Sequence, residues 1–171
     1  RTDAGPFVYH VFQDDVNRWI AMRREIYPLI DELTPPELVD PIVLFDTAEI
    51  TVAGRYKKSG LSVVLSIDIA VAFEQDEIIL RAAALRCGSV RVPINFASLG
   101  LNRPIDRPAG ALWPGSPRMS GDFLSGFHIQ ARAWWKNGGY DYRVLGVNVE
   151  PGKLNLKIEP LGRHPSKAAR H

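Results

Sequence analysis

The fold of this chain is decided by residues 61–73, whose sequence is LSVVLSIDIAVAF. Every second residue is a large apolar one, which is the period of a β-strand that buries one face; these residues are Leu61, Val63, Leu65, Ile67, Ile69, Val71 and Phe73. At roughly 3.3 Å per residue such a strand is about 40 Å long, whereas most strands have about five or six residues. A strand of this length must twist and curl around whatever it covers.

Turn signals and further alternating stretches lie on both sides of residues 61–73. Residues 74–77, EQDE, are polar and lead into another apolar stretch from Ile78 to Cys87, so we predict a long antiparallel hairpin over residues 61–87. Upstream, the two-residue period starts at Ile42. Further strands are predicted over residues 49–56, 127–135, 140–149 and 154–158, with Asn137-Gly138-Gly139 and Pro151-Gly152 as the turns between the last three.

One convincing helical pattern precedes these strands. Asp14 and Asp15 offer N-cap chemistry for a helix from Asp15 to Tyr27, and its apolar stripe includes Val16, Trp19 and Ile20. Short helical turns are predicted over residues 33–39 and 94–99, whereas residues 102–121 are rich in proline and glycine and are predicted to be a loop. The sequence therefore predicts an α+β fold, in which a long, curved antiparallel meander wraps an N-terminal amphipathic helix.

Length and charge restrict the classes of partner. The chain has 171 residues, which suits one domain, and we expect that domain to cover residues 1–162, with a basic, disordered tail over residues 163–171. The chain has 21 Lys and Arg against 19 Asp and Glu, and the basic excess lies in this tail, at Arg163, Lys167 and Arg170. A nucleic-acid binder usually carries a basic face on its folded body, so we expect no nucleic-acid partner. The sequence has no run of about 18 apolar residues that could span a membrane.

Motifs for catalysis or cofactor binding are missing from the sequence. Neither His10 nor His128 has a histidine or cysteine partner at metal-ligand spacing, and there is no nucleophile elbow, phosphate-binding glycine loop or dinucleotide fingerprint. Cys87 lies in a predicted strand, where a buried and unreactive thiol is the usual interpretation. Asp14 and Asp15 could form an acid and base pair, but helix capping explains them more simply. We therefore predict a non-enzymatic protein without a metal or a cofactor.

Two tryptophans are candidate contacts for a partner. Trp134 and Trp135 are adjacent in a predicted strand, so their indoles point to opposite faces of the sheet. Trp134, which shares a face with Arg132, is either covered by loops or exposed to a partner or a membrane interface. Trp113 lies in the proline-rich loop, where it either pins the loop to the body or contacts a partner.

Two short motifs resemble a group of bacterial extracytoplasmic proteins that are usually anchored by an N-terminal membrane helix. Residues 12–21, FQDDVNRWIA, resemble their opening helix, and residues 147–156, VNVEPGKLNL, resemble their closing β-hairpin. The chain is similar to the tubular lipid-binding superfamily over most of residues 7–161, although residues 102–121 have no counterpart there. This resemblance implies a curved sheet around a helix, an apolar ligand between them, and a place in the periplasm or cell envelope.

These observations predict a lipid-like or other apolar ligand in a groove between the helix and the long strand. The predicted ligand-binding residues are Val16, Trp19, Ile20, Val63, Leu65, Ile67 and Ile69. Because the chain begins at Arg1 rather than at a methionine, we expect a signal or anchoring segment to precede it and to make the only membrane contact. The alternative is a structural or protein-interaction module with a filled core, which contacts partners through residues 102–121 or a sheet edge.

Overall fold

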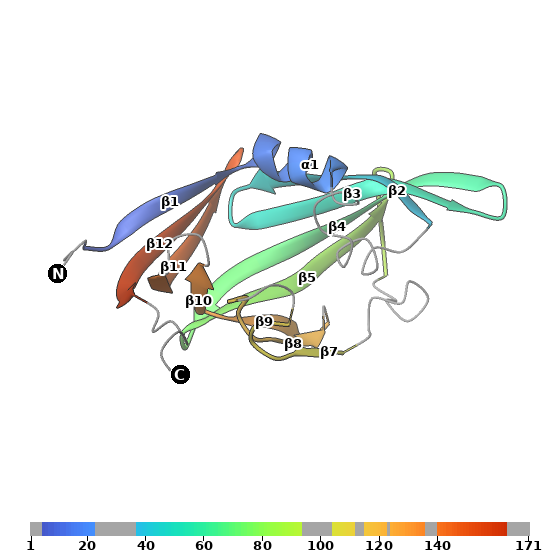
Figure 1. Ribbon diagram of the computed structural model, residues 1–171. Helices are drawn as coiled ribbons and strands as arrows, with labels where there is room; N and C mark the ends of the chain where they lie inside the picture. Colours follow the sequence, from blue (N-terminus) through green and yellow to red (C-terminus); the bar gives the residue numbers. More distant parts are fainter. Residues whose placement is uncertain are drawn as a thin grey trace.

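The computed structural model describes residues 5–22, 37–93, 104–111, 115–122, 124–135 and 140–163. Within these ranges the chain forms twelve strands and one helix, so the described part of the protein is mostly β-structure (Figure 1). The elements are β1 (Phe7–Phe12), α1 (Gln13–Ala21), β2 (Leu38–Asp46), β3 (Glu49–Lys58), β4 (Leu61–Glu74), β5 (Glu77–Cys87), β6 (Val90–Val92), β7 (Ile105–Arg107), β8 (Met119–Asp122), β9 (Gly126–Gln130), β10 (Arg132–Trp135), β11 (Tyr140–Glu150) and β12 (Lys153–Arg163).

The strands form two antiparallel sheets. The small sheet has four strands in the order β1-β12-β11-β10, and the large sheet has eight, in the order β2-β3-β4-β5-β9-β8-β7 with β6 added to β5. The chain passes from the large sheet to the small one between β9 and β10, where Ala131 is held from both sides. Its N–H donates to the carbonyl oxygen of Asp76 at 2.9 Å, and its own carbonyl accepts from the N–H of Val144 at 2.6 Å.

A second junction joins the β11–β12 turn to the end of β2. The N–H of Gly152 donates to the carbonyl of Phe45 at 3.1 Å, and the N–H of Ala48 donates to the carbonyl of Val149 at 3.1 Å. A cluster of buried core residues lies at this junction and consists of Val43, Phe45 and Val149, with Val16, Ile20, Ile50, Val52, Val71 and Leu154 packed against it. The small sheet thus lies across one end of the large sheet, while β3 and β4 extend well beyond it (Figure 1).

The hairpin predicted from residues 61–87 is confirmed. β4 and β5 pair from Glu74 opposite Glu77 to Leu65 opposite Cys87. The register shifts by one residue, because Asp68 lies opposite Ala84 whereas Ile69 lies opposite Ala82. Of the face predicted to be buried, Ile69 is buried and its neighbours at positions 63, 65 and 67 are half-buried. The strand over 140–149 and the final strand are confirmed too, and the turn between them has Gly152 at φ +79°, the left-handed conformation of a type II turn.

The predicted α+β fold, with a sheet wrapped around the helix, is wrong. The single described helix has nine residues, and it lies along the edge of β2 instead of inside a curved sheet. The reason is its polar side: the Asn17 amide donates to the carbonyl of Val43 at 2.8 Å and accepts from the N–H of Val43 at 2.7 Å, and Gln13 accepts from the N–H of Phe45 at 2.7 Å. An apolar stripe predicts that a helix packs on something, but it does not distinguish the edge of a sheet from its interior.

Other boundaries differ from the prediction as well. Leu38 and Val39, expected in a helical turn over 33–39, begin β2, and the loop expected over 102–121 contains β7 and β8. The strand expected over 127–135 is divided into β9 and β10 at Ala131. Residues 23–36, 94–103, 136–139 and 164–171 lie outside the described residues, and with them the end of the first predicted helix, the helix over 94–99, the Asn137-Gly138-Gly139 turn and nearly all of the tail. Among the described residues, no helix has the length and apolarity that crossing a bilayer requires.

Candidate functional site: the apolar face of the large sheet

Strand register places the apolar side chains of β2, β3, β4 and β5 on one face of the large sheet, which we call the apolar face. Residues directly opposite each other in an antiparallel sheet point to the same side, so the pairings define rows across the strands. The rows are Phe45–Ile50–Ile69–Ala82, Val43–Val52–Ile67–Leu85, Gly54–Leu65–Cys87 and Leu38–Tyr56–Val63. Every side chain in these rows is uncharged.

One end of the apolar face is covered by the rest of the protein. There Val149 and Leu154 of the small sheet, together with Val16 and Ile20 of α1, pack against the residues of the first two rows. Ile69 is 7% exposed, in line with this cover. This end of the face is ordinary hydrophobic core.

The other end of the apolar face carries less cover. Val63 and Leu65 lie in the rows beyond those that contain core residues, and Ile67 lies in the adjoining row beside Val52; all three are half-buried. Tyr56 and Cys87, beside them in the rows, are half-buried too. At the tip of the β3–β4 hairpin the same face ends at Leu61, which is 72% exposed. From Val63 to Ile67 the strip is about 13 Å long at roughly 3.3 Å per residue.

The structure separates the predicted ligand-binding residues into two groups. Val16 and Ile20 contact the core at the covered end, next to the row of Ile69. Val63, Leu65 and Ile67 lie further along β4 on the same face. Trp19 belongs to neither group, since it is not among the α1 residues that pack against the core and is 47% exposed. The helix is therefore part of the core cover at one end, and it does not form a wall that faces the strip.

Of the two predicted partner contacts, Trp113 and Trp134, only Trp134 lies in a strand that the structure describes. Trp113 lies outside the described residues. Trp134 lies in β10, where its backbone pairs with that of Asp141 in β11.

Sequence reasoning missed Tyr56 and Cys87, which lie beside the strip, and Leu85, which is buried opposite Ile67. Tyr56 belongs to an alternating stretch that was visible in the sequence, but its place beside Val63 depends on the β3–β4 register. Leu85 and Cys87 reach this face only because of the register shift at Asp68 and Ile69. Cys87 is half-buried, where a fully buried thiol was expected.

The opposite face of the large sheet carries ion pairs between neighbouring strands, next to buried apolar residues such as Ile79 and Ala84. Asp68 is 5% exposed; its carboxylate accepts from Arg86 at 2.9 Å and from the Thr51 hydroxyl at 2.9 Å. Further along, Nδ1 of His128 lies 2.8 Å from a carboxylate oxygen of Glu77. These pairs connect neighbouring strands, so their evident role is to satisfy polar groups on the sheet. In the described ranges no group of three or more His, Cys, Asp or Glu side chains could hold a metal ion.

The shifted pKa values belong to exposed turns and pairs. A backbone hydrogen bond from Ser125 lowers the pKa of Asp122, and the hydrogen bond with Lys153 lowers that of Glu150. The hydrogen bond with Asp76 raises the pKa of Arg143. Turn caps and salt bridges produce such shifts in many proteins, so they do not point to a reaction.

No protein-family model, no curated protein and no solved structure matches this chain. The resemblance to the tubular lipid-binding superfamily therefore stays a prediction.

Proposed function

We propose that this protein is a non-enzymatic domain of the cell envelope that binds a lipid-like chain along the half-buried end of the apolar face. The observation that carries the proposal is the half-buried strip of Val63, Leu65 and Ile67, which continues beyond the core. Apolar surface left in contact with water has an unfavourable free energy, which a hydrocarbon chain laid on it would relieve. The envelope location rests on the resemblance of residues 12–21 and 147–156 alone.

The chemistry of the strip favours a flexible aliphatic ligand. Its side chains are aliphatic except for Tyr56 and Cys87, and the rows contain no charged group that would select a polar ligand. The strip is about 13 Å long, close to the hydrocarbon depth of one membrane leaflet, roughly 15 Å. Each methylene buried there would contribute about 0.8 kcal/mol, so a chain that covers only part of the strip would still bind measurably.

A titration with a fluorescent fatty-acid probe tests the proposal. Leu65→Trp would fill the middle of the strip and abolish probe uptake. The matched control is Val64→Trp, the same new side chain one residue earlier on the opposite face, where Val64 is 52% exposed. We expect the control to bind the probe like the wild type.

Three results would contradict the proposed function: no uptake by the wild type, unchanged uptake in Leu65→Trp, or equal loss in both variants. Circular dichroism of each variant establishes that the strands are retained. Mass spectrometry of small molecules extracted from the purified protein would then identify the natural ligand.

A further inference from the structure

Among the described residues, the two sheets end at β2, β7, β1 and β10, and three of these four end strands are protected against pairing with another strand. On the edge strand β2, Gln13 and Asn17 of α1 occupy backbone groups of Phe45 and Val43. The other two protected edges are short, since β7 has three residues and β10 has four. Covered and short edges are the usual means by which soluble proteins avoid edge-to-edge association.

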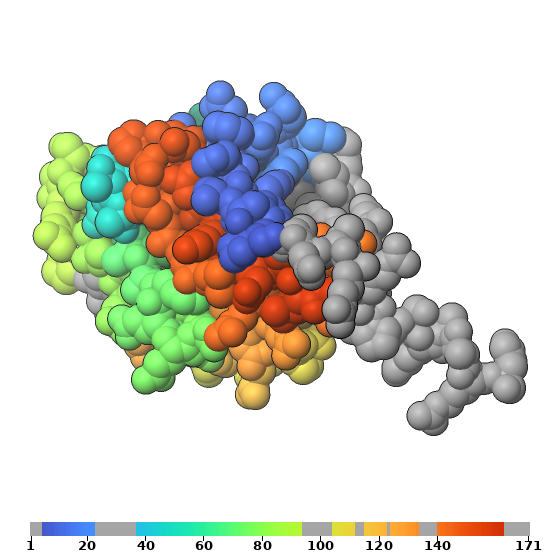
Figure 2. Space-filling view, turned by 90° about the vertical axis from the view of Figure 1, so that its left-hand side faces the viewer, coloured from blue at the N-terminus to red at the C-terminus, as the bar shows by residue number. Residues whose placement is uncertain are grey.

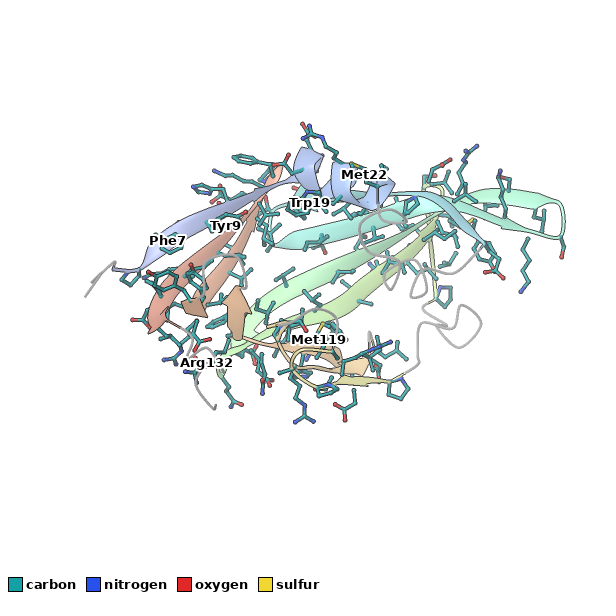
Figure 3. All side chains as sticks on the ribbon, in the orientation of Figure 1. Phe7, Tyr9, Trp19, Met22, Met119 and Arg132 are labelled. Atoms are coloured by element: carbon teal, nitrogen blue, oxygen red, sulfur yellow. The ribbon has the colours of Figure 1, made fainter. Side chains whose placement is uncertain are left out.

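The fourth end strand, β1, has none of these protections from the part of the chain that the structure describes. It has six residues, FVYHVF, none of which is a lysine, an aspartate, a glutamate or a proline. Large apolar side chains are exposed on both of its faces: Phe7 is 43%, Val8 51%, Tyr9 47% and Phe12 52% exposed. β1 lies on the surface beside β12 (Figure 2), and Phe7 and Tyr9 project from it (Figure 3).

The register identifies the backbone groups that point out of this edge. β1 and β12 pair without a shift from Phe7 opposite Ile158 to Phe12 opposite Lys153. Next along the same register, the N–H of Gln13 donates to the carbonyl of Gly152 at 3.0 Å. Hydrogen-bonded and non-bonded pairs alternate in an antiparallel ladder, so the odd-numbered residues of β1 bond to β12. The N–H and C=O groups of Val8 and His10 and the N–H of Phe12 therefore point outward, whereas the C=O of Phe12, the N-cap residue of α1, accepts the first hydrogen bond of that helix.

We propose that β1 pairs antiparallel with β1 of a second copy of this chain, so that two small sheets join into one continuous sheet. A two-fold axis at His10 uses the outward groups of Val8 and His10 and the N–H of Phe12 in each strand. It places Val8 opposite the partner's Phe12 and Tyr9 opposite the partner's Val11, with the N–H and C=O of His10 bonded to those of the partner's His10.

The properties of β1 favour a second copy over an unrelated strand. β1 has no lysine, arginine or acidic residue, so self-pairing brings no such like charges together. Val8 with Phe12 is a β-branched and aromatic cross-strand pair, a favourable combination. Pro6 precedes the strand and α1 follows it directly, so β1 is limited to six residues. A second copy of the chain presents a strand of the same length. The inference does not depend on lipid binding, because the apolar strip lies on the large sheet.

Sedimentation equilibrium of the wild type and of position 10 variants tests the pairing. We expect a concentration-dependent dimer for the wild type. His10→Pro removes an outward N–H without breaking a bond to β12, as proline is tolerated at the outward positions of an edge strand, and it should yield a monomer. His10→Ala is the matched control, because it loses the same side chain, including the contact of Nδ1 with Asn155 at 2.7 Å, but keeps the N–H. It should remain dimeric.

A second pair of variants keeps the test decisive if His10→Pro does not fold. Val8→Lys should weaken the dimer by up to about 25-fold, because the axis repeats the substitution and each of the two lost cross-strand pairs contributes up to about a fivefold factor. Val64→Lys is its control, since Val8 and Val64 are 51% and 52% exposed. Three outcomes would overturn the proposal. The first is a monomeric wild type. The others are a dimer that survives both β1 substitutions, or equal effects of Val8→Lys and Val64→Lys, and either would show that the contact between copies does not involve β1.

Discussion

Asn17→Ala should detach α1 from the edge of the large sheet, and its cost can be worked out from the contacts. The Asn17 amide makes two hydrogen bonds to the backbone of Val43, of 2.8 and 2.7 Å. Gln13, four residues earlier, makes a third to the N–H of Phe45. Four helical residues rise about 6.0 Å and two strand residues about 6.7 Å, so the two side chains match alternate residues of β2.

The expected loss of stability is the balance of two effects. Two part-buried hydrogen bonds contribute about 1 kcal/mol each. Alanine has a higher helix propensity than asparagine, which offsets about 0.6 kcal/mol of this loss. The net loss is therefore about 1.5 kcal/mol, which in a domain of this size lowers Tm by about 3–6 °C. Urea denaturation gives the free energy of unfolding, and hydrogen exchange at the Val43 amide reports on the lost bond directly.

The control for this substitution is Asn148→Ala. Asn148 makes an exposed hydrogen bond of 2.9 Å to Glu150, so its loss should change stability by less than about 0.5 kcal/mol. Equal effects of the two substitutions, or unchanged exchange of the Val43 amide in Asn17→Ala, would refute the docking of α1 on this edge.

Two further predictions compare neighbouring or similar sites by thermal denaturation. Ile69→Asp places a carboxylate in the core and should lower the free energy of unfolding by several kcal/mol. Ala70→Asp, at the neighbouring exposed position on the opposite face, should lower it little. Similar losses of stability in the two variants would mean that Ile69 is not in the core. Gly121→Ala should destabilise by about 2 kcal/mol or more, because φ is +97° and a Cβ there would lie 2.2 Å from the carbonyl oxygen of Gly126. Gly146→Ala, with nothing within 4 Å of its Cβ, should be close to neutral, and a neutral Gly121→Ala would be evidence against this path of β8.

Local sequence patterns correctly predicted the hairpin and the turn, which depend on residues that are close together in the chain. The two-residue period of residues 61–73 determines that alternate side chains share a face, and the polar residues 74–77 end the strand, so the β4–β5 hairpin could be predicted. The Pro151-Gly152 turn could be predicted for the same kind of reason, since glycine adopts a positive φ without strain.

The tertiary structure decided what covers each face. The stripe of Val16 and Ile20 is compatible with a helix inside a curved sheet, and the two bonds of Asn17 to Val43, 26 residues away, place it on an edge instead. For this reason the fold class was wrong even though the main hairpin was right. β7 and β8 were missed because each is short and is stabilised mainly by pairing with its neighbours.

The candidate site divides in the same way. The sequence placed Val63, Leu65, Ile67 and Ile69 on one face, but only the packing of Val149 and Leu154 over its end makes Ile69 core and leaves Leu65 half-buried. The position of β1 at the end of the small sheet could not be predicted from its six residues either, because it depends on how all the other strands pair. Periodicity determines the direction of a side chain, whereas its cover depends on residues that are distant in the chain.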